Sequence, residues 1–158
     1  MIKNNILSIF FVIGIFLLDR ISKILVVNYF NKLETSNISV FTFLDLSLVW
    51  NDGIAFGLFA FEHNFYYNLL TIIIVTITLF IFWMITKYDG LDKISFTMIF
   101  GGSIGNIFDR ILHSSVPDFI DIHINNFHWF IFNVADIFIT LGVVLLIYSE
   151  LFLKKNKI

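Results

Sequence analysis

Residues 101–110, with the sequence GGSIGNIFDR, lie inside a long apolar segment and decide how this chain folds. Gly102, Gly105, Asn106 and Asp109 recur at helical spacing, so they form one stripe along a helix. Small residues on such a stripe let helices approach each other closely within a membrane. Close packing explains the glycines, but it requires neither Asn106 nor Arg110. We therefore expect this helix to pack along its stripe and to carry polar groups for a site at one end.

The composition is that of an integral membrane protein. Of 158 residues, 58% are hydrophobic and only 14% are charged, whereas a soluble domain is nearer to a quarter charged. The formal net charge of −2 is too small to indicate a nucleic acid or polyanionic partner. Because there is no cysteine, disulfides, thiolate catalysis and cysteine metal sites are excluded. The length predicts a single integral-membrane domain over residues 1–158.

Four segments are long enough to cross the hydrocarbon core, which takes about 20 helical residues. They cover residues 6–27, 67–86, 94–112 and 130–153. The first resembles a signal peptide, because Lys3 precedes its apolar core, but Asp19 and Arg20 follow in place of a small-residue cleavage site. We predict an all-α membrane protein with four transmembrane helices, the first of which is retained.

The positions of lysine and arginine predict the orientation of these helices. Lysines occur at the N-terminus, in the loop 87–93 and in the C-terminal tail, whereas segment 31–66 carries only Lys32 and residues 113–129 carry none. We therefore expect a multi-pass membrane protein with both termini cytoplasmic. The polar residues at the ends of the helices then face outward.

The connection over residues 31–66 has structure of its own. Residues 39–50 alternate between apolar and polar types, which is the pattern of a half-buried strand. Asn51, Asp52 and Gly53 then supply a turn, and a short apolar stretch follows at 54–61. We predict a small extracytoplasmic β-sheet and an interfacial segment, forming a sheet and lid over about 33–61.

Two aspartates, Asp118 and Asp136, are the best candidates for chemistry. Each borders an apolar segment, and a carboxylate at a bilayer is costly and normally kept for function. Asn133 and Thr140 share a helical face with Asp136. An acid that merely complements the start of a helix is the simpler interpretation of Asp136, but its position inside the apolar run favours function. If the two acids converge, they predict acid–base chemistry on a lipid-embedded substrate.

Several other interpretations remain open. Gly101, Ser103 and Gly105 form the G-x-S-x-G pattern of serine hydrolases, which would indicate a serine peptidase. The serine lies near the middle of a predicted helix, however, and every histidine lies outside the predicted spans. A metal site has candidate ligands in one external loop but no recognised ligand spacing; they are His113, Asp118, Asp121, His123 and His128. Paired acids could also serve a proton-coupled transporter, or the chain could be a membrane scaffold. Asp19 and Lys23, four apart on the first helix, are either a local ion pair or part of the site.

The ordered motifs resemble those of the lipoprotein signal peptidases, the bacterial type II signal peptidases. The match runs along nearly the whole chain in five pieces. These are Asp19-x-x-x-Lys23, Asn51-x-Gly53-x-Ala55-Phe56-Gly57, Gly102-x-x-Gly105-Asn106-x-x-Asp109-Arg110, Asp118-Phe119 and Phe132-Asn133-x-Ala135-Asp136. Four helices with cytoplasmic termini and a small external sheet are what this resemblance implies for the fold.

The resemblance implies an aspartic endopeptidase that cleaves before the diacylglyceryl-modified cysteine of a prolipoprotein lipobox. Its catalytic pair corresponds to Asp118 and Asp136, and it implies no cofactor, no metal and a monomer bound to membrane lipid. The supporting and substrate-binding positions correspond to Asp19, Lys23, Asn51, Gly53, Ala55, Phe56, Gly105, Asn106, Asp109, Arg110, Asn133 and Ala135. Three positions depart from the usual pattern: Arg20 replaces glutamine, Ser22 replaces threonine, and Pro117 stands where an aliphatic residue is common.

Overall fold

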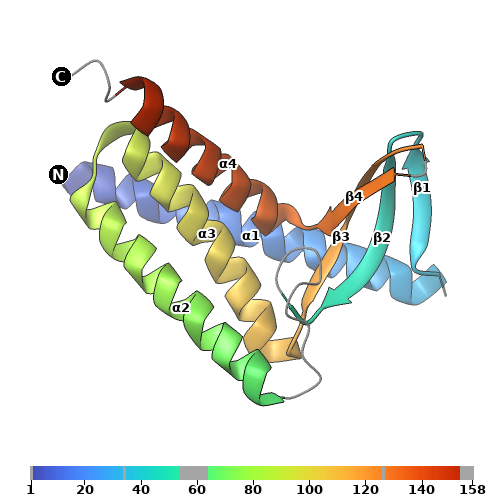
Figure 1. Cartoon of the computed structure of the whole chain (residues 1–158). Coiled ribbons are helices and arrows are strands. Elements are labelled where there is room, and N and C mark those ends of the chain that lie inside the picture. Colours follow the sequence, from blue (N-terminus) through green and yellow to red (C-terminus); the bar gives the residue numbers. More distant parts are fainter. Residues whose placement is uncertain (1, 34, 54–63, 126, 154–158) are drawn as a thin grey trace.

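A computed structural model describes residues 2–33, 35–53, 64–125 and 127–153. A bundle of helices occupies one end of the molecule, and an antiparallel sheet occupies the other (Figure 1). In chain order the elements are α1 (Ile2–Leu33), β1 (Asn37–Phe41), β2 (Leu44–Asn51), α2 (Asn64–Lys87), α3 (Gly90–His113), β3 (Val116–Ile124), β4 (Phe127–Phe132), α4 (Val134–Tyr148) and the short π-helix η2 (Ser149–Leu153).

Helices occur in all four segments that were predicted to be helical, but one boundary was wrong. Phe130 to Phe132 lie in β4, so the last helix begins at Val134 and not at residue 130. An aromatic run of this kind suits a strand as well as a helix, and only Asn133, which caps α4, marks the division. By length and hydropathy, two described stretches qualify as candidate membrane spans: Tyr67–Lys87 and Val134–Leu153.

The helix α3 is the centre of the bundle, because it packs against α1, α2 and α4. Its glycines allow this close approach, as the stripe predicted. A Cβ atom built on Gly102 would lie 2.5 Å from the carbonyl oxygen of Ala135 in α4, and one on Gly105 would lie 2.6 Å from a carboxylate oxygen of Asp19 in α1. Any side chain at these two positions would therefore push α3 away from its neighbours.

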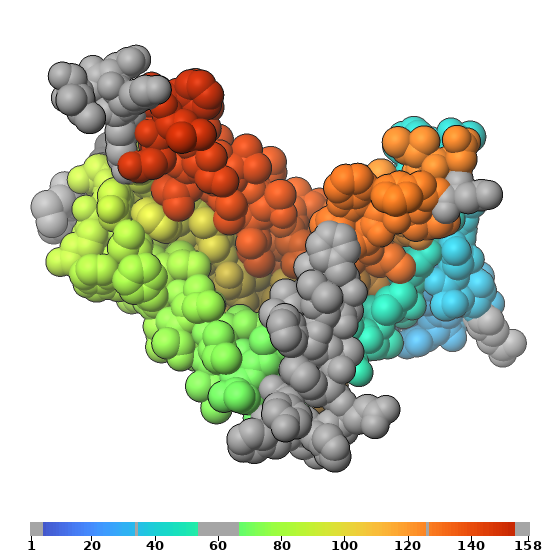
Figure 2. All heavy atoms as spheres, in the orientation of Figure 1, coloured from blue at the N-terminus to red at the C-terminus, as the bar shows by residue number. Residues whose placement is uncertain are grey.

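Burial in the bundle is the reverse of that in a soluble protein. Asp19, Lys23 and Asp109 are at most 2% exposed, whereas charged side chains are almost never fully buried unless they are paired. Large apolar side chains such as Phe10 and Leu79 lie on the outside instead. In the space-filling view α2, α3 and α4 form one lobe, and the sheet forms the other together with the end of α1 (Figure 2). This distribution suits a bundle surrounded by lipid.

The sheet has four strands in the order β1-β2-β3-β4, and all neighbours are antiparallel. The alternating stretch 39–50 was predicted as one strand pattern, but it forms a hairpin that turns at Thr42 and Phe43. The strands β3 and β4 occupy the segment that was predicted to be an external loop. The strand β3 pairs with β2, which is about seventy positions earlier in the chain, so local patterns could not indicate this pairing.

The helix ends nearest to the lysines lie on one side of the bundle. The start of α1, the connection between α2 and α3, and the end of α4 lie together at the end of the bundle opposite the sheet (Figure 1). The lid and interfacial segment predicted at 54–61, with Ala55, Phe56 and Gly57, lies outside the described residues.

A matched pair of glycine substitutions tests the close contact between α3 and α4. We expect Gly102→Ala to lower the free energy of unfolding by about 1–3 kcal/mol, because the new methyl group overpacks the contact between α3 and α4. Gly14→Ala on α1 is the control, since a Cβ there meets no described atom within 4 Å; it should be neutral or slightly stabilising. Thermal unfolding in detergent compares the two, and equal stability would contradict the close helix contact.

Candidate active site

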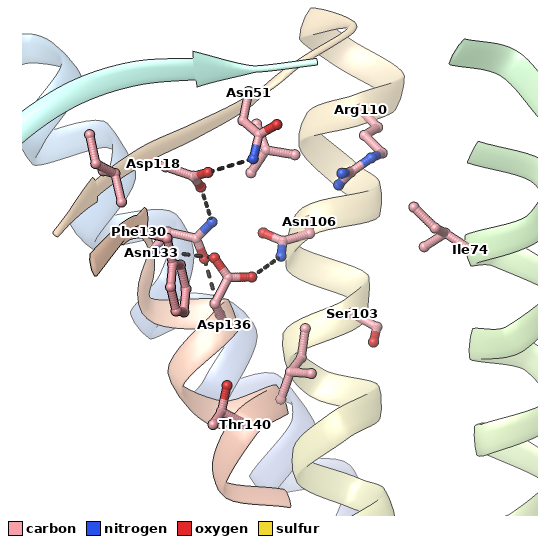
Figure 3. A pocket seen from close by; sticks show the side chains of 13 residues that line it. Asn51, Ile74, Ser103, Asn106, Arg110, Asp118, Phe130, Asn133, Asp136 and Thr140 are labelled. Atoms are coloured by element: carbon pink, nitrogen blue, oxygen red, sulfur yellow. Dashed lines mark hydrogen bonds between the residues drawn. The ribbon is translucent and has the colours of Figure 1, made fainter. Parts of the chain in front are cut away.

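Asp118 and Asp136 line the same cavity, although they come from different elements. Asp118 is on β3 and Asp136 is in the first turn of α4, and the cavity between them has a volume of about 260 Å³ (Figure 3). Its lining residues are Asn51, Ile74, Ser103, Asn106, Arg110, Val116, Asp118, Phe130, Ile131, Asn133, Asp136, Ile139 and Thr140. The tertiary structure therefore brings the two acids to one cavity that has both polar and apolar lining residues.

Asp118 is held by two amide groups. The side chain of Asn51, at the end of β2, donates to one of its oxygens at 2.8 Å, and the side chain of Asn133 donates to the other at 2.6 Å. Antiparallel pairing of β2 with β3, in which Val49 is opposite Asp118, brings Asn51 to this position. Asp118 is only 4% exposed, so these two hydrogen bonds are its main polar contacts apart from the cavity.

Asp136 is fixed by the start of its own helix. Asn133 caps α4 by accepting a hydrogen bond from the backbone N–H of Asp136, and Asp136 accepts one in return from the backbone N–H of Asn133 at 3.1 Å. This reciprocal capping box is a strong helix start. The second carboxylate oxygen accepts from the side chain of Asn106 on α3 at 2.8 Å.

The side-chain amides of Asn51, Asn106 and Asn133 each have a fixed orientation, because a flip of the amide would break a second hydrogen bond. The carbonyl oxygen of Asn51 accepts from the backbone N–H of Gly53 at 2.9 Å, and that of Asn133 accepts from the backbone N–H of Asp136. The carbonyl oxygen of Asn106 accepts from the ammonium of Lys23 at 2.9 Å. Because N–H groups and ammonium ions can only donate, every NH₂ group must point at a carboxylate. The amides therefore present donors to both acids.

A buried ion cluster lies behind the cavity. Lys23 contacts Asp19 on its own helix at 2.9 Å and Asp109 on α3 at 2.7 Å. Asp19 also accepts a hydrogen bond from the backbone N–H of Ala135, in the first turn of α4, at 3.1 Å. The pair predicted between Asp19 and Lys23 is thus present, and it also extends to Asn106 and to the helix that carries Asp136.

Arg20 belongs to the same cluster, although it was not among the predicted site residues. Its guanidinium donates to Asp109 through two nitrogens and to Asp19 at 2.7 Å. The signal that could have found it was a second cation next to an acid inside an apolar helix, where isolated charges are rare.

Arg110 connects the cavity to the end of the sheet. Its side chain donates to the carbonyl oxygen of Gly53 at 2.5 Å, and its Nε atom is buried with no hydrogen-bond partner among the described residues. The hydroxyl of Tyr67 on α2 donates to the backbone carbonyl of Arg110. Arg110 also lines the cavity, so a donor group is available there for a bound carbonyl.

Among the described residues, the serine and histidine candidates are not grouped as a hydrolase site or a metal site. Ser103 lines the cavity, but none of its described lining residues is a histidine that could act as a base. His123 and His128 are not in a loop: they stack on each other across β3 and β4, with Asp45 and Asp121 as their acidic partners. Within the described ranges no group of three or more histidine or acidic side chains is placed to hold a metal ion.

Burial of Asp118 changes its acidity. Removal from water raises the pKa of Asp118 to about 6, and the nearby negative charge of Asp136 adds to the effect. The hydrogen bonds from Asn51 and Asn133 act in the opposite direction but do not outweigh burial. A carboxyl group with a pKa near neutrality is suited to acid–base catalysis.

Comparison with known proteins identifies the family of this chain. The family profile described as Signal peptidase (SPase) II matches residues 11–152. The chain is 45% identical to the lipoprotein signal peptidase of Pelagibacter ubique over 99% of this chain and 94% of that protein. It is 38% identical to the lipoprotein signal peptidase of Aquifex aeolicus, over 90% of this chain and 84% of that protein.

Two solved structures, each titled as a bacterial membrane enzyme, share the fold. The first has a TM-score of 0.74 and 26% sequence identity, and the alignment spans 96% of this chain and 91% of the solved chain. The second has a TM-score of 0.70 and 24% identity, and covers 92% of both chains.

The acidity of Asp118 predicts how stability depends on pH. The pKa of Asp118 rises from 3.8 to about 6 on folding, so its contribution is fully present below pH 3.8 and is lost as the pH rises through 6. The total change is about 3 kcal/mol. Asp118→Asn should therefore flatten the fall in stability between pH 4 and 7, measured by thermal unfolding in detergent. The exposed Asp52→Asn should leave the slope as it is, and an unchanged slope in Asp118→Asn would contradict the raised pKa.

Proposed function

The chain belongs to the signal peptidase II family, and from this premise we propose that Asp118 and Asp136 are its catalytic dyad. It is a bacterial membrane peptidase that removes signal peptides from prolipoproteins. The proposal makes it an aspartic endopeptidase. The observation that carries it is the shared cavity, into which two carboxylates from different elements extend with amide donors on both. Because the chain is a peptidase, the transporter and scaffold alternatives are not retained.

Hydrolysis by two acids requires one of them ionised and one protonated. Two carboxylates that face one cavity cannot both ionise easily, so the pair shares one proton and titrates as a unit, as the paired acids of aspartic proteases do. The ionised carboxylate takes a proton from a water molecule, whose oxygen attacks the carbonyl carbon of the scissile bond. The protonated carboxyl group gives its proton to the carbonyl oxygen. Collapse of the tetrahedral intermediate then releases the amine, which takes up the proton first removed from water, while one hydroxyl group of the intermediate returns its proton to the other carboxylate, so that the pair again holds one proton.

Neighbouring groups support this reaction in distinct ways. Asn51, Asn133 and Asn106 orient the two acids, since their amides cannot turn over without losing a contact. Arg110 lines the cavity, and its guanidinium supplies a donor for a backbone carbonyl of the substrate. Charged donors aimed at developing negative charge are among the strongest contributions to catalysis.

The apolar residues that line the cavity are suited to a lipid-modified substrate. Ile74 from α2 lines it on the side away from the sheet (Figure 3), and Ile139 from α4 is a further lining residue. We infer that the diacylglyceryl-modified cysteine of the lipobox enters between these helices, with its lipid in the outer leaflet and the scissile bond at the dyad. Gly53, which follows β2, would then contact the substrate from the sheet side.

We also infer that all four helices cross the membrane in a single monomeric domain. The helices α2 and α4 are apolar enough by themselves. The helices α1 and α3 carry more charge, but the charges in the cluster are paired with one another and buried, which reduces their cost in lipid. The lysines at the end opposite the sheet support cytoplasmic termini, and the dyad would then lie at the outer face.

Substitution of the dyad tests the assignment. We expect Asp118→Asn and Asp136→Asn each to reduce cleavage by at least about 100-fold, since general acid–base catalysis is lost, while both proteins stay folded in the membrane. The assay is the gel shift of a diacylglyceryl-modified prolipoprotein. Asp52→Asn removes an exposed carboxylate and should cleave at the wild-type rate; robust turnover by either dyad variant would overturn the assignment.

The pH profile is a second test. The pKa of Asp118, about 6 in the presence of ionised Asp136, marks where the pair loses its single proton. Above that pH the acid catalyst is missing, so kcat/KM should fall about tenfold per pH unit. Measurement of kcat/KM from pH 4.5 to 8.5 checks this, and a profile that rises steadily across the range would contradict a shared proton.

A further inference from the structure

The guanidinium of Arg20 is held in one position from four sides. It donates to the carboxylates of Asp19 and Asp109, and it lies 5.0 Å from the ring centroid of Phe108 and 5.9 Å from that of Phe16. Only 12% of its side chain is exposed. A cation that is paired twice and flanked by aromatic rings is well fixed, so Arg20 is a built part of the cluster.

A continuous chain of contacts leads from Arg20 to the dyad. Arg20 and Lys23 both bind Asp109, and Lys23 also binds the carbonyl oxygen of Asn106. The amide of Asn106 then donates to Asp136. Arg20 is not among the described residues that line the cavity, so any effect that it has on the reaction passes through these neighbours or through its charge.

The charges around the dyad come from several elements. Among the described residues they are Asp19, Arg20 and Lys23 on α1, Asp52 after β2, Tyr67 on α2, and Asp109 and Arg110 on α3. Of these, Asp52 is exposed and screened by solvent, and the Tyr67 phenol is uncharged at neutral pH. The rest are buried or nearly so.

When every acid is ionised, the charged groups of the dyad and the ion cluster behind it leave one negative charge. The four carboxylates of Asp19, Asp109, Asp118 and Asp136 face three cations, which are Arg20, Lys23 and Arg110. One proton on the dyad makes the whole cluster neutral, which is the state that a low-dielectric environment favours. Without Arg20 the same cluster would carry two negative charges, and neutrality would require a second proton.

We propose that Arg20 is a positioning residue that sets the pH range in which the Asp118–Asp136 pair holds a single proton. The inference rests on the proposed dyad. Loss of the Arg20 charge strengthens proton binding by the pair, so both limbs of the activity profile move to higher pH. Loss of the Asp109 charge has the opposite sign and moves them to lower pH. A neutral residue at position 20 would thus give an enzyme that works in a more alkaline range.

The experiment compares pH profiles of kcat/KM for a set of charge variants in the full chain. Arg20→Gln should move the profile upward by about half to one pH unit, and Asp109→Asn should move it downward by a similar amount. The double variant R20Q/D109N restores the charge balance and should return to the wild-type position. Lys32→Gln removes an exposed cation from the same helix and should leave the profile unmoved. Arg20→Lys keeps the charge and should rescue the position of the profile.

The outcomes separate charge balance from a structural role. If Arg20 served only to hold α1 against α3, its variants would lower the rate at every pH without moving either limb, and that result would overturn the inference. If Arg20→Gln does not accumulate in the membrane, Asp109→Asn decides: a downward shift supports the inference and an unmoved profile overturns it. Full activity of Asp136→Asn would instead reject the proposed dyad itself, so the two failures are distinguishable.

Discussion

The ammonium of Lys23 lies almost fully buried between α1 and α3, where an unpaired charge would cost several kcal/mol. It is matched by Asp19, Asp109 and the carbonyl oxygen of Asn106, which use its three donors. These partners come from two helices, so the need to pair one charge fixes how the helices meet. The glycines of α3 depend on the same constraint, because only a residue without a side chain allows Asp19 to approach at Gly105.

The pairing of Lys23 also determines how residues of the site are oriented. Lys23 fixes the amide of Asn106, which then can present only its NH₂ group to Asp136. Asp19 binds the backbone N–H of Ala135 and so holds the first turn of α4, where Asp136 is placed. The buried ion cluster thus stabilises the bundle and orients a carboxylate with the same contacts. A site built on helix ends and fixed amides is more rigid than one built on loops alone.

The burial of Asp118 lowers the stability of the fold at neutral pH but suits the residue to proton transfer. Burial raises the pKa of Asp118, which means that its ionised form destabilises the folded state. The hydrogen bonds from Asn51 and Asn133 offset part of this cost without removing it. A carboxyl group whose pKa lies near neutral pH is useful for proton transfer. A carboxyl group whose charge is fully paired in salt bridges would stay ionised and would be less useful.

The sequence by itself determined the helices, the glycine stripe and the chemical identity of the polar residues, because periodicity and the cost of charge in lipid are local properties. It did not determine that Asp118 lies on a strand, since β3 pairs with β2 across about seventy positions of sequence and its aromatic-rich neighbourhood suits a loop or helix equally. Nor did it indicate that Arg20 joins Asp109, which lies on another helix. Only the tertiary structure decided these points, because hydrogen bonds and ion pairs between distant residues exist only once the helices and the sheet have packed.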